Sequence, residues 1–377
     1  MTRICHLTSA HPWDDTRIFH KQAKTLASAG FDVHLVAART DSKLVDGVHV
    51  HGVRGPSGGR LSRMIGTAWR VIREGRRLRA DIYHFHDPEL LPWVWLLRLR
   101  GARVVYDVHE DLPRDIMTKA WIPSPLRRLA AGFFEMVENL VAQRVSAVVA
   151  ATPHIRDRFA RIGAQSIAVC NFPRLEELAP AEPGVQRRRQ VCYVGGLAPV
   201  RGLRELVLAI DAVPDVELAL CGDFSDPGFE AELRALPGWA KVRFHGYVGR
   251  AAIAQVLAES VAGLVVLQPV ESYKDALPVK MFEYMASGIP VIASDFPLWR
   301  EIVEGHRCGL CVTPAGPEAP AAIAGAISYL LEYPETAAQL GANGRNAVEQ
   351  HFSWGCEAER LVALYRDLEP DREVCPT

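Results

Sequence analysis

The sequence DALPVKMFEYMASGIPVIAS, residues 275–294, predicts a short helix followed directly by a buried strand. Pro278 suits the first turn of a helix, where its missing N–H costs nothing, and Gly288 suits the end, before the apolar run at 289–293. The amides of a first helical turn have no partners inside the helix and carry partial positive charge. Together with Lys280 they predict a site for a phosphate or diphosphate.

Glu283 follows Lys280 by three residues, on the same face of the predicted helix. A carboxylate in that position could accept hydrogen bonds from the hydroxyls of a ribose. In the alternative interpretation the two side chains form a surface ion pair worth about 0.2–0.5 kcal/mol, in a helix that only packs its apolar side. The residues of this stretch leave both interpretations open.

The stretch resembles the nucleotide-sugar motif of family-four retaining glycosyltransferases of the GT-B fold, because Asp275 and Glu283 are eight positions apart and precede a Met-Ala-x-Gly-x-Pro-Val ending. The resemblance runs from His6 to Tyr365. It implies that Glu283 holds the ribose of a nucleoside diphosphate sugar, that Leu277 lies in the donor site, and that Asp275 contacts the donor sugar and the charge that forms on it. Asp275 is one methylene shorter than the glutamate usual in the family.

A second segment, YVGGLAPVRG at 193–202, predicts a strand, a glycine turn and the start of a helix. It resembles the Gly-Arg-Leu-x-x-x-Lys-Gly element of the same family, whose two basic residues bind the donor diphosphate. Gly196 stands where that arginine is usual, and Arg201 stands where that lysine is usual. The resemblance therefore implies a diphosphate site at Gly195, Gly196 and Arg201 that lacks one cation, for which Lys280 would compensate.

The segment FHGYVGR at 244–250 also matches the family pattern. The resemblance implies that Tyr247 lies near the nucleotide base of the donor. Packing of Tyr247 at the end of a strand explains the same residue equally well.

Apolar, strand-like segments alternate with longer helical patterns along the chain, which predicts two Rossmann-like α/β domains. A chain of 377 residues is also too long for one ordinary core. The segment at 172–190, rich in proline and charge, predicts the linker. We expect an acceptor-side domain at 1–172, a nucleotide-sugar domain at 190–360 and a C-terminal helix and tail at 361–377. The GT-B resemblance implies that the domains face each other across a cleft and that the C-terminal helix crosses back to the first domain.

Histidines and carboxylates follow the predicted strands at 82–85 and 103–108, in the sequences HFHDPEL and YDVHEDLP. Loops at the carboxyl ends of parallel strands face the ligand site of such a sheet. These residues would also suit a divalent metal, and their spacing alone leaves that question open. The family resemblance implies a site without metal, in which His109 lies near the reacting sugar and stabilises its positive charge, while His86 and Glu110 belong to the acceptor side.

The loop after the first predicted strand reads HPWDDTRIFH, from His11 to His20, where many family members have a glycine-rich loop. Asp15 and Arg17 are candidates for contacts with the acceptor. Capping of the following helix explains Asp15 as well.

The charge is divided unequally between the two halves. Residues 1–175 contain 26 Lys and Arg against 16 Asp and Glu, or +10, and residues 176–377 contain 17 against 28, or −11. A basic half predicts an anionic partner. Residues 60–79 contain seven arginines, one acid and an apolar stripe, which suits a helix on an anionic membrane, although packing on its own sheet explains the stripe equally well. Nucleic acid is not expected, because interleaved surface aromatics are missing.

No apolar run reaches the roughly 18 to 20 residues that span a bilayer, and the N-terminus lacks the apolar core of a signal peptide. We therefore expect a cytoplasmic protein, peripheral to the inner membrane, whose eight scattered cysteines form no disulfide framework. Cys308 and Cys311 have the spacing of a zinc or redox pair, but no second pair accompanies them. A strand is the favoured interpretation.

Taken with these patterns, the family resemblance implies a retaining hexosyltransferase without cofactor or metal. It would use a nucleoside diphosphate sugar as donor and a lipid-linked saccharide as acceptor, in exopolysaccharide or lipopolysaccharide biosynthesis. The main alternative is a non-catalytic nucleotide-sugar-binding partner of a polysaccharide assembly complex, suggested by the departures at Gly196 and Asp275. A dinucleotide-dependent oxidoreductase is not favoured, because the first strand is followed by His-Pro-Trp-Asp-Asp rather than Gly-x-Gly-x-x-Gly.

Overall fold

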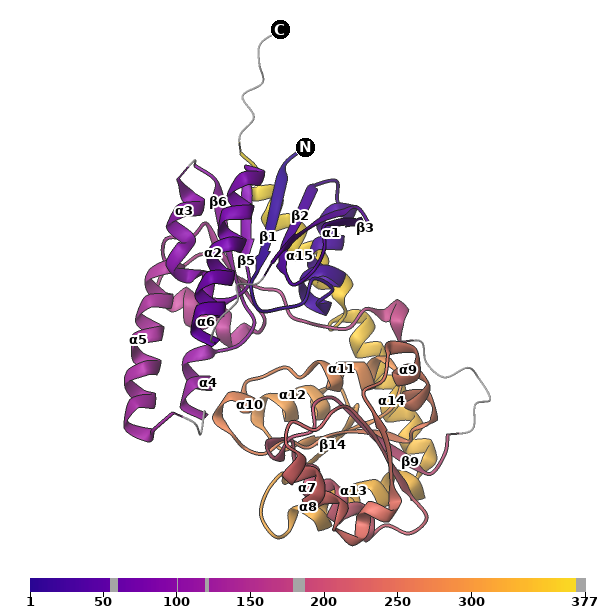
Figure 1. Cartoon of the computed structure of the whole chain (residues 1–377). Helices are drawn as coiled ribbons and strands as arrows, with labels where there is room; N and C mark the ends of the chain where they lie inside the picture. The colour runs from indigo at the N-terminus through magenta and orange to yellow at the C-terminus, as the bar shows by residue number, and fades with distance from the viewer. Residues whose placement is uncertain (55–59, 100, 119–121, 179–186, 371–377) are drawn as a thin grey trace. The chain divides into compact units, whose positions relative to one another are not determined.

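The computed structural model describes residues 1–54, 60–99, 101–118, 122–178 and 187–370. The chain forms two compact units: unit 1 comprises Met1–Asn171 and Gly355–Thr377, and unit 2 comprises Phe172–Trp354. Figure 1 shows the elements of both units. Within the predicted linker, residues 172–178 belong to unit 2, and residues 179–186 lie outside the described part.

Unit 1 is built on a sheet in which eight strands are described, in the order β3-β4-β2-β1-β5-β6-β7-β8. Only β3 among these runs antiparallel to its neighbour. The strands are β1 (Arg3–Thr8), β2 (Asp32–Ala38), β3 (Lys43–Val45), β4 (Val48–Val53), β5 (Ile82–Phe85), β6 (Arg103–Val108), β7 (Ala147–Ala150) and β8 (Ser166–Ala168). The strand order reverses between β1 and β5, so the carboxyl ends of these two strands mark the position where ligands bind in sheets of this type.

Helices cover both faces of this sheet (Figure 1). They are η1 (Thr16–Ala23), α1 (Lys24–Ser28), α2 (Arg60–Leu78), η2 (Pro88–Trp93), α3 (Val94–Arg98), α4 (Leu112–Thr118), α5 (Ser124–Ala142), α6 (Pro153–Arg161) and α15 (Trp354–Asp367). Side chains of α2, η2, α3, α5 and α6 share one apolar core with β5, β6 and β7. We call this group of helices the outer layer.

α15 packs on the opposite face of the same sheet. The hydroxyl of Tyr365 lies 2.6 Å from Nδ1 of His84, and its ring contacts Phe31. At the start of α15, Glu357 accepts a hydrogen bond from the backbone N–H of Cys170. The predicted return of the C-terminal helix to the first domain is confirmed, because α15 belongs to unit 1 from Gly355 onward.

Unit 2 has a six-stranded parallel sheet among its described residues, in the order β11-β10-β9-β12-β13-β14. This is the doubly wound order of Rossmann-like domains. Its strands are β9 (Gln190–Val194), β10 (Glu217–Cys221), β11 (Val242–Gly246), β12 (Ala262–Val265), β13 (Val291–Ser294) and β14 (Gly309–Val312). Its helices are η3 (Leu175–Glu177), η4 (Pro199–Arg201), α7 (Leu203–Asp211), α8 (Pro227–Arg234), η5 (Pro237–Lys241), α9 (Arg250–Glu259), α10 (Glu271–Lys274), α11 (Val279–Ala286), α12 (Pro297–Gly305), α13 (Ala319–Glu332) and α14 (Pro334–Gln350).

Cys308 and Cys311 lie at β14, as the strand interpretation predicts. Burial raises the pKa of each thiol to about 12. Because the thiolate is both the metal ligand and the redox nucleophile, this environment does not favour a zinc or redox pair. Among the described helices, none is at once long and apolar enough to cross a bilayer.

Candidate functional site

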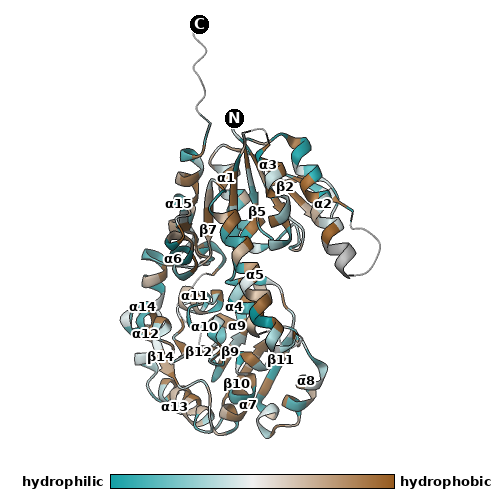
Figure 2. Cartoon of the chain, turned by 90° about the vertical axis from the view of Figure 1, so that its left-hand side faces the viewer, coloured by the Kyte–Doolittle hydropathy of each residue, from teal (hydrophilic) through white to brown (hydrophobic). Residues whose placement is uncertain are grey.

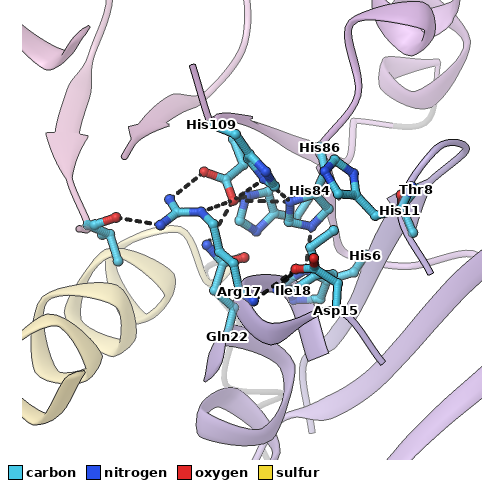
Figure 3. Close-up of polar contacts among 12 residues, drawn as sticks. His6, Thr8, His11, Asp15, Arg17, Ile18, Gln22, His84, His86 and His109 are labelled. Atoms are coloured by element: carbon cyan, nitrogen blue, oxygen red, sulfur yellow. Dashed lines mark hydrogen bonds and ion pairs between the residues drawn. The ribbon is translucent and has the colours of Figure 1, made fainter. Parts of the chain in front are cut away.

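The alternation of side chains along three neighbouring strands of unit 1 gathers polar groups on one face of the sheet. On β5, Tyr83 and Phe85 enter the apolar core, so His84 points to the other face. By the same period of two, His6 of β1 and Asp107 of β6 share that face with His84. All three are completely buried. Figure 3 shows the resulting cluster of histidines, to which His86 adds a further ring directly after β5.

Asp107 is the centre of this cluster, and Arg17 is its main counter-charge. The guanidinium of Arg17 donates from Nε to Oδ2 of Asp107 at 3.0 Å and from Nη2 to Oδ1 at 2.6 Å, while Nη1 donates to the carbonyl of Val169 at 2.7 Å. Burial would raise the pKa of Asp107, but Arg17 and His109 hold it well below its usual range. The expectation that Arg17 meets the acceptor needs correction, because its side chain is only 4% exposed and each guanidinium nitrogen already has a protein partner.

The same carboxylate orders two histidines. Oδ2 of Asp107 lies 3.0 Å from Nδ1 of His86 and 3.2 Å from Nε2 of His109, and it accepts a hydrogen bond from Gln22. The other nitrogen of His86 lies 3.0 Å from Nδ1 of His6. Burial lowers the pKa of His86 to about 3. His86, which the sequence assigned to the acceptor side, is therefore a neutral, buried support for its neighbours.

His109 is the member of this cluster that also reaches solvent. Its side chain is 19% exposed, whereas those of Asp107 and His86 are fully buried. Its ring lies 4.9 Å from that of His11, between ring centroids. A partly exposed imidazole whose orientation is fixed by a buried carboxylate is suited to contact a ligand with a defined nitrogen.

His11 is a functional candidate that the sequence reasoning did not identify. Its Nδ1 lies 2.7 Å from Oδ1 of Asp87, and this hydrogen bond raises the pKa of His11. Asp87 is itself held by the hydroxyl of Thr8 and the backbone N–H of Ser9. The signal was present in the sequence, because His11 and Asp87 belong to two loops that follow the adjacent strands β1 and β5.

The structure gives Asp15 the capping role. Its Oδ1 accepts hydrogen bonds from the backbone N–H groups of Arg17, at 2.8 Å, and Ile18, at 2.9 Å (Figure 3). The carboxylate thus satisfies free amides at the start of η1. Glu110, the other acidic acceptor-side candidate, is exposed.

The ligand atoms of His6, His84 and His86 lie within 4.8 Å of one another, and so do those of His86, Asp107 and His109. Such spacing would admit a divalent ion. However, the one carboxylate of these groups is already neutralised by Arg17. A cation beside that guanidinium would meet a like charge, so the donor set favours a hydrogen-bonded cluster over a metal centre.

In unit 2, α11 forms where the sequence predicts it, and Lys280 lies in its first turn. Pro278 occupies the N-cap position and provides no side-chain hydrogen bond. The Nζ atom of Lys280 is buried without a hydrogen-bond partner among the described residues, and it lies 3.7 Å from the centre of the Tyr193 ring. Burial, with Arg201 nearby, holds the pKa of Lys280 well below its usual range. The surface-pair interpretation of Lys280 is therefore wrong.

Gly195 and Gly222 form the turns that border this lysine. Gly195 has φ +132°, and a Cβ there would lie 2.8 Å from Nζ of Lys280. Gly222 has φ +142°, and a Cβ there would meet the carbonyl oxygen of Gly195 at 2.0 Å. Only glycine fits at either position. Gly196, which follows Gly195 in the chain, accepts a hydrogen bond through its carbonyl from the hydroxyl of Tyr193.

Glu283, one turn further along α11, has a partner that the sequence reasoning missed. Its Oε1 accepts a hydrogen bond from Nη1 of Arg250 at 2.6 Å, and Nη2 of Arg250 donates to Glu177 at 3.1 Å. Glu283 is 7% exposed, so its carboxylate is largely removed from water. Arg250 ends the FHGYVGR segment, which was the available sequence signal.

The remaining donor-site candidates lie at the surface of unit 2. Asp275 is exposed at the C-terminal end of α10, and Leu277 is half-buried between α10 and α11. Arg201 lies over the ring of Tyr273, 5.1 Å from its centre. Tyr247 is 80% exposed, so packing at a strand end does not describe it.

Comparison with known proteins identifies the family. Residues 16–174 match the model of the glycosyl transferase 4-like domain, and residues 176–347 match that of glycosyl transferases group 1. The chain is 28% identical over 313 residues to the MMP alpha-(1->4)-mannosyltransferase of Mycolicibacterium hassiacum, covering 79% of this chain and 73% of that protein. It is 25% identical over 307 residues to the phosphatidyl-myo-inositol mannosyltransferase of Mycobacterium leprae, covering 76% and 74%.

Solved structures show the same fold. The sucrose-phosphate synthase of Thermosynechococcus elongatus superposes with a TM-score of 0.77 at 21% identity, over 98% of this chain and 99% of that one. The Anabaena protein HepE, in complex with UDP and glucose, gives 0.73 at 16% identity, over 97% and 100%. With two matched family models and this fold, the chain belongs to the family-four glycosyltransferases of the GT-B type.

Proposed function

We propose that this glycosyltransferase moves a hexose from a nucleoside diphosphate sugar to a lipid-linked saccharide, with retention of anomeric configuration and without a metal ion. The reaction would serve the assembly of a cell-surface polysaccharide, as an exopolysaccharide or lipopolysaccharide, at the cytoplasmic side of the inner membrane. The observation that carries the proposal is the buried amine of Lys280 at the first turn of α11, which has no hydrogen-bond partner in the part of the chain that the structure describes.

A buried amine that has no hydrogen-bond partner among the described residues is costly, and it is most easily explained by a ligand that supplies acceptor oxygens and negative charge. A diphosphate does so, and it would also accept hydrogen bonds from the amides of the first turn of α11. Arg201, whose charge already acts on Lys280, adds a second cation. These groups would stabilise the departing diphosphate in the role that a metal ion has in other sites.

The carboxylate of Glu283 is assigned to the ribose hydroxyls, with Arg250 as the residue that holds it in place. Tyr247, exposed in the loop before Arg250, is assigned to the base. In support of a nucleoside diphosphate donor, the HepE structure contains UDP and glucose.

His109 is assigned to the reacting sugar, where its ring would stabilise positive charge, and Asp107 is its positioning residue. Asp275 is assigned to the donor sugar. Support for a lipid-linked acceptor comes from the Mycobacterium leprae relative, whose name specifies mannosyl transfer to a phosphatidyl-myo-inositol, and from the +10 charge of the first 175 residues.

A thermal-shift screen with a panel of nucleoside diphosphate sugars tests the donor class, because a ligand at 100 times its dissociation constant adds about 2.7 kcal/mol of apparent stability. Hydrolysis of the stabilising donor is then measured in EDTA, for the wild type and for His109→Ala and Glu283→Ala. Turnover that survives EDTA and is lost in both variants supports the proposal. Tight donor binding without turnover on water or on any lipid acceptor would favour the non-catalytic partner instead.

A further inference from the structure

The exposed apolar side chains of unit 1 are concentrated on one helix of the outer layer. Along α5 five large apolar residues between 45% and 71% exposed follow one another at intervals of three and four: Leu126, Leu129, Phe133, Met136 and Leu140. We call these residues the α5 stripe. Figure 2 colours α5 by hydropathy, with its apolar residues in brown. Apolar residues at this spacing lie along a single side of a helix.

The α5 stripe points away from the core of unit 1. The buried residues of α5 are Ala131, Glu138, Val141 and Ala142, of which Val141 and Ala142 join the apolar core. Since neighbouring residues of a helix are about 100° apart, the stripe lies on the side of α5 opposite to them. A continuous apolar strip of this kind, facing solvent, marks an interaction site rather than a scattered surface residue.

α2, in contrast, uses most of its apolar side for its own sheet. Ala68, Val71 and Ile72 are completely buried in the core, as the packing interpretation of this helix predicts. On the side away from the sheet, Ile65 and Trp69 remain 52% and 40% exposed. Residues 60–64, which complete the predicted stripe, have side chains outside the described part.

That outward side of α2 is also strongly basic. Four arginines line a hollow of about 360 Å³ together with Trp69: Arg73, Arg76, Arg77 and Arg79. Among the described residues no acidic side chain lines this hollow, although Arg77 is paired with Glu74 at 2.9 Å. On the neighbouring α3, Trp95 is 42% exposed, and Leu99, directly after that helix, is 64% exposed. At the start of α5, Arg128 is also exposed. On the same helix, Glu135 is paired with Arg114 and does not add free negative charge.

An anionic bilayer fits this surface better than a second protein chain does. The α5 stripe amounts to about three fully exposed apolar side chains, on the order of 500 Å². A stable protein interface covers roughly 800 Å² on each partner, of which about 57% is apolar, so the area alone does not separate the two occupants and the charge decides. The outward sides of α2, α3 and α5 belong to one layer, where tryptophans, apolar side chains and arginines occur together, as they do at the interface between lipid and water.

We propose that the outer layer of unit 1 binds the surface of an anionic bilayer, with the α5 stripe inserted among the lipids and the arginines of α2 on lipid phosphates. The inference deepens the proposed function, since it names the surface that would bring the enzyme to a lipid-linked acceptor. It also assigns insertion among the lipids to α5, whereas the sequence suggested the helix at 60–79, which is α2.

Flotation of the full chain with vesicles tests the inference, using equal parts of phosphatidylglycerol and phosphatidylethanolamine, with phosphatidylcholine vesicles for comparison. Leu129→Gln/Phe133→Gln/Met136→Gln should lower the bound fraction on the anionic vesicles by on the order of tenfold, because it removes apolar contact without changing charge. The matched control changes three exposed apolar residues outside the outer layer, Leu44→Gln/Tyr329→Gln/Tyr333→Gln, and should bind like the wild type.

A second variant, Arg73→Gln/Arg76→Gln, separates charge from insertion. It should weaken binding severalfold at low ionic strength and much less at high salt, where the attraction is already screened. Hydrogen exchange of α5 should slow when vesicles are added to the wild type. Failure of the wild type to float on anionic vesicles, or equal flotation of the Leu129/Phe133/Met136 variant, overturns the inference. A wild-type dimer in solution that dissociates in the Leu129/Phe133/Met136 variant would also overturn it, in favour of a second copy as the occupant.

The proposed function is tested separately, in solution without lipid. Donor binding and hydrolysis by the Leu129/Phe133/Met136 variant should equal those of the wild type, since α5 carries none of the donor-site residues. A chain that floats but binds no nucleoside diphosphate sugar would refute the proposed function and leave the membrane surface standing.

Discussion

Replacement of Lys280 by methionine should have opposite effects on stability and on donor binding. Methionine keeps an unbranched apolar side chain that ends in a methyl group one atom short of Nζ, which lies 3.7 Å from the centre of the Tyr193 ring. It removes a buried amine that has no hydrogen-bond partner among the described residues. An unsatisfied buried polar group costs about 1–3 kcal/mol. We therefore expect the ligand-free Lys280→Met protein to be more stable than the wild type by about that amount.

The same change should weaken the diphosphate site. A hydrogen bond to a charged group contributes about 1.5–3 kcal/mol, which corresponds to a loss of roughly 10- to 150-fold in affinity for a nucleoside diphosphate. The control is Lys274→Met on α10, whose lysine is exposed and paired with Glu271 at 2.8 Å. An exposed pair contributes little, so this variant should change neither property appreciably.

Thermal unfolding without ligand and titration calorimetry with UDP and UDP-sugars measure the two effects. For a domain of the size of unit 2, a gain of 1 kcal/mol raises the transition by roughly 2–4 °C. The transition of unit 2 must be separated from that of unit 1, because a chain with two units need not unfold in one step. A less stable ligand-free Lys280→Met protein would refute the account of its burial, and an unchanged affinity would refute its role in the donor site.

Three further outcomes are expected. Asp107→Asn should destabilise unit 1 by about 3–5 kcal/mol in chemical denaturation, because it leaves the buried guanidinium of Arg17 without this counter-charge. Adding Arg17→Met to the same chain should restore part of the lost stability. Additive losses from the two changes would contradict the pairing. Glu283→Ala should weaken UDP binding by roughly 10- to 150-fold in calorimetry, whereas Glu271→Ala, at an exposed position, should not. Equal UDP affinities of the two variants would refute the assignment of Glu283 to the ribose hydroxyls. The stability of unit 1 should fall as the pH drops from about 6.5 toward 3. Burial holds the pKa of His86 at about 3 and the pKa values of His6 and His84 well below 6.5. The unfolded chain therefore binds more protons than the folded chain in that pH window. The depressed pKa of Asp107 acts separately, since its stabilisation is present above about 3.8 and is lost only below it; a flat stability between pH 6.5 and 4 would contradict the neutral histidines.

The sequence predicted the fold well where local signals agree with tertiary structure. In the 275–294 stretch, a proline at the helix start and a glycine at its end predicted α11 and β13. The hairpin of the edge strand β3 with β4 was not predicted, although its two-residue turn, Asp46-Gly47, is a hairpin signal in the sequence. The helix expected after Asp15 begins as a π-helix, η1, before it continues as α1, a local change of pitch for which the apolar pattern gives no signal.

The candidate site was predicted in its residue types but not in its pairings. The sequence correctly placed His86 and His109 after the carboxyl ends of neighbouring strands of the sheet. Which side chain faces a ligand and which supports it depends on contacts such as that between Arg17 and Asp107, 90 residues apart in the chain. Likewise, spacing within one helix suggested Lys280 as the partner of Glu283, whereas the structure gives that role to Arg250 from another helix.

The place of α15 has a consequence for how the polypeptide emerges during synthesis. Tyr365 covers His84, yet about 180 residues of unit 2 are made between the two parts of unit 1. At about 5–20 residues per second, the nascent N-terminal part waits roughly 10–40 s before its last helix leaves the ribosome. During that interval His84 lacks the contact with Tyr365, so maturation of this face of unit 1 depends on the synthesis of α15.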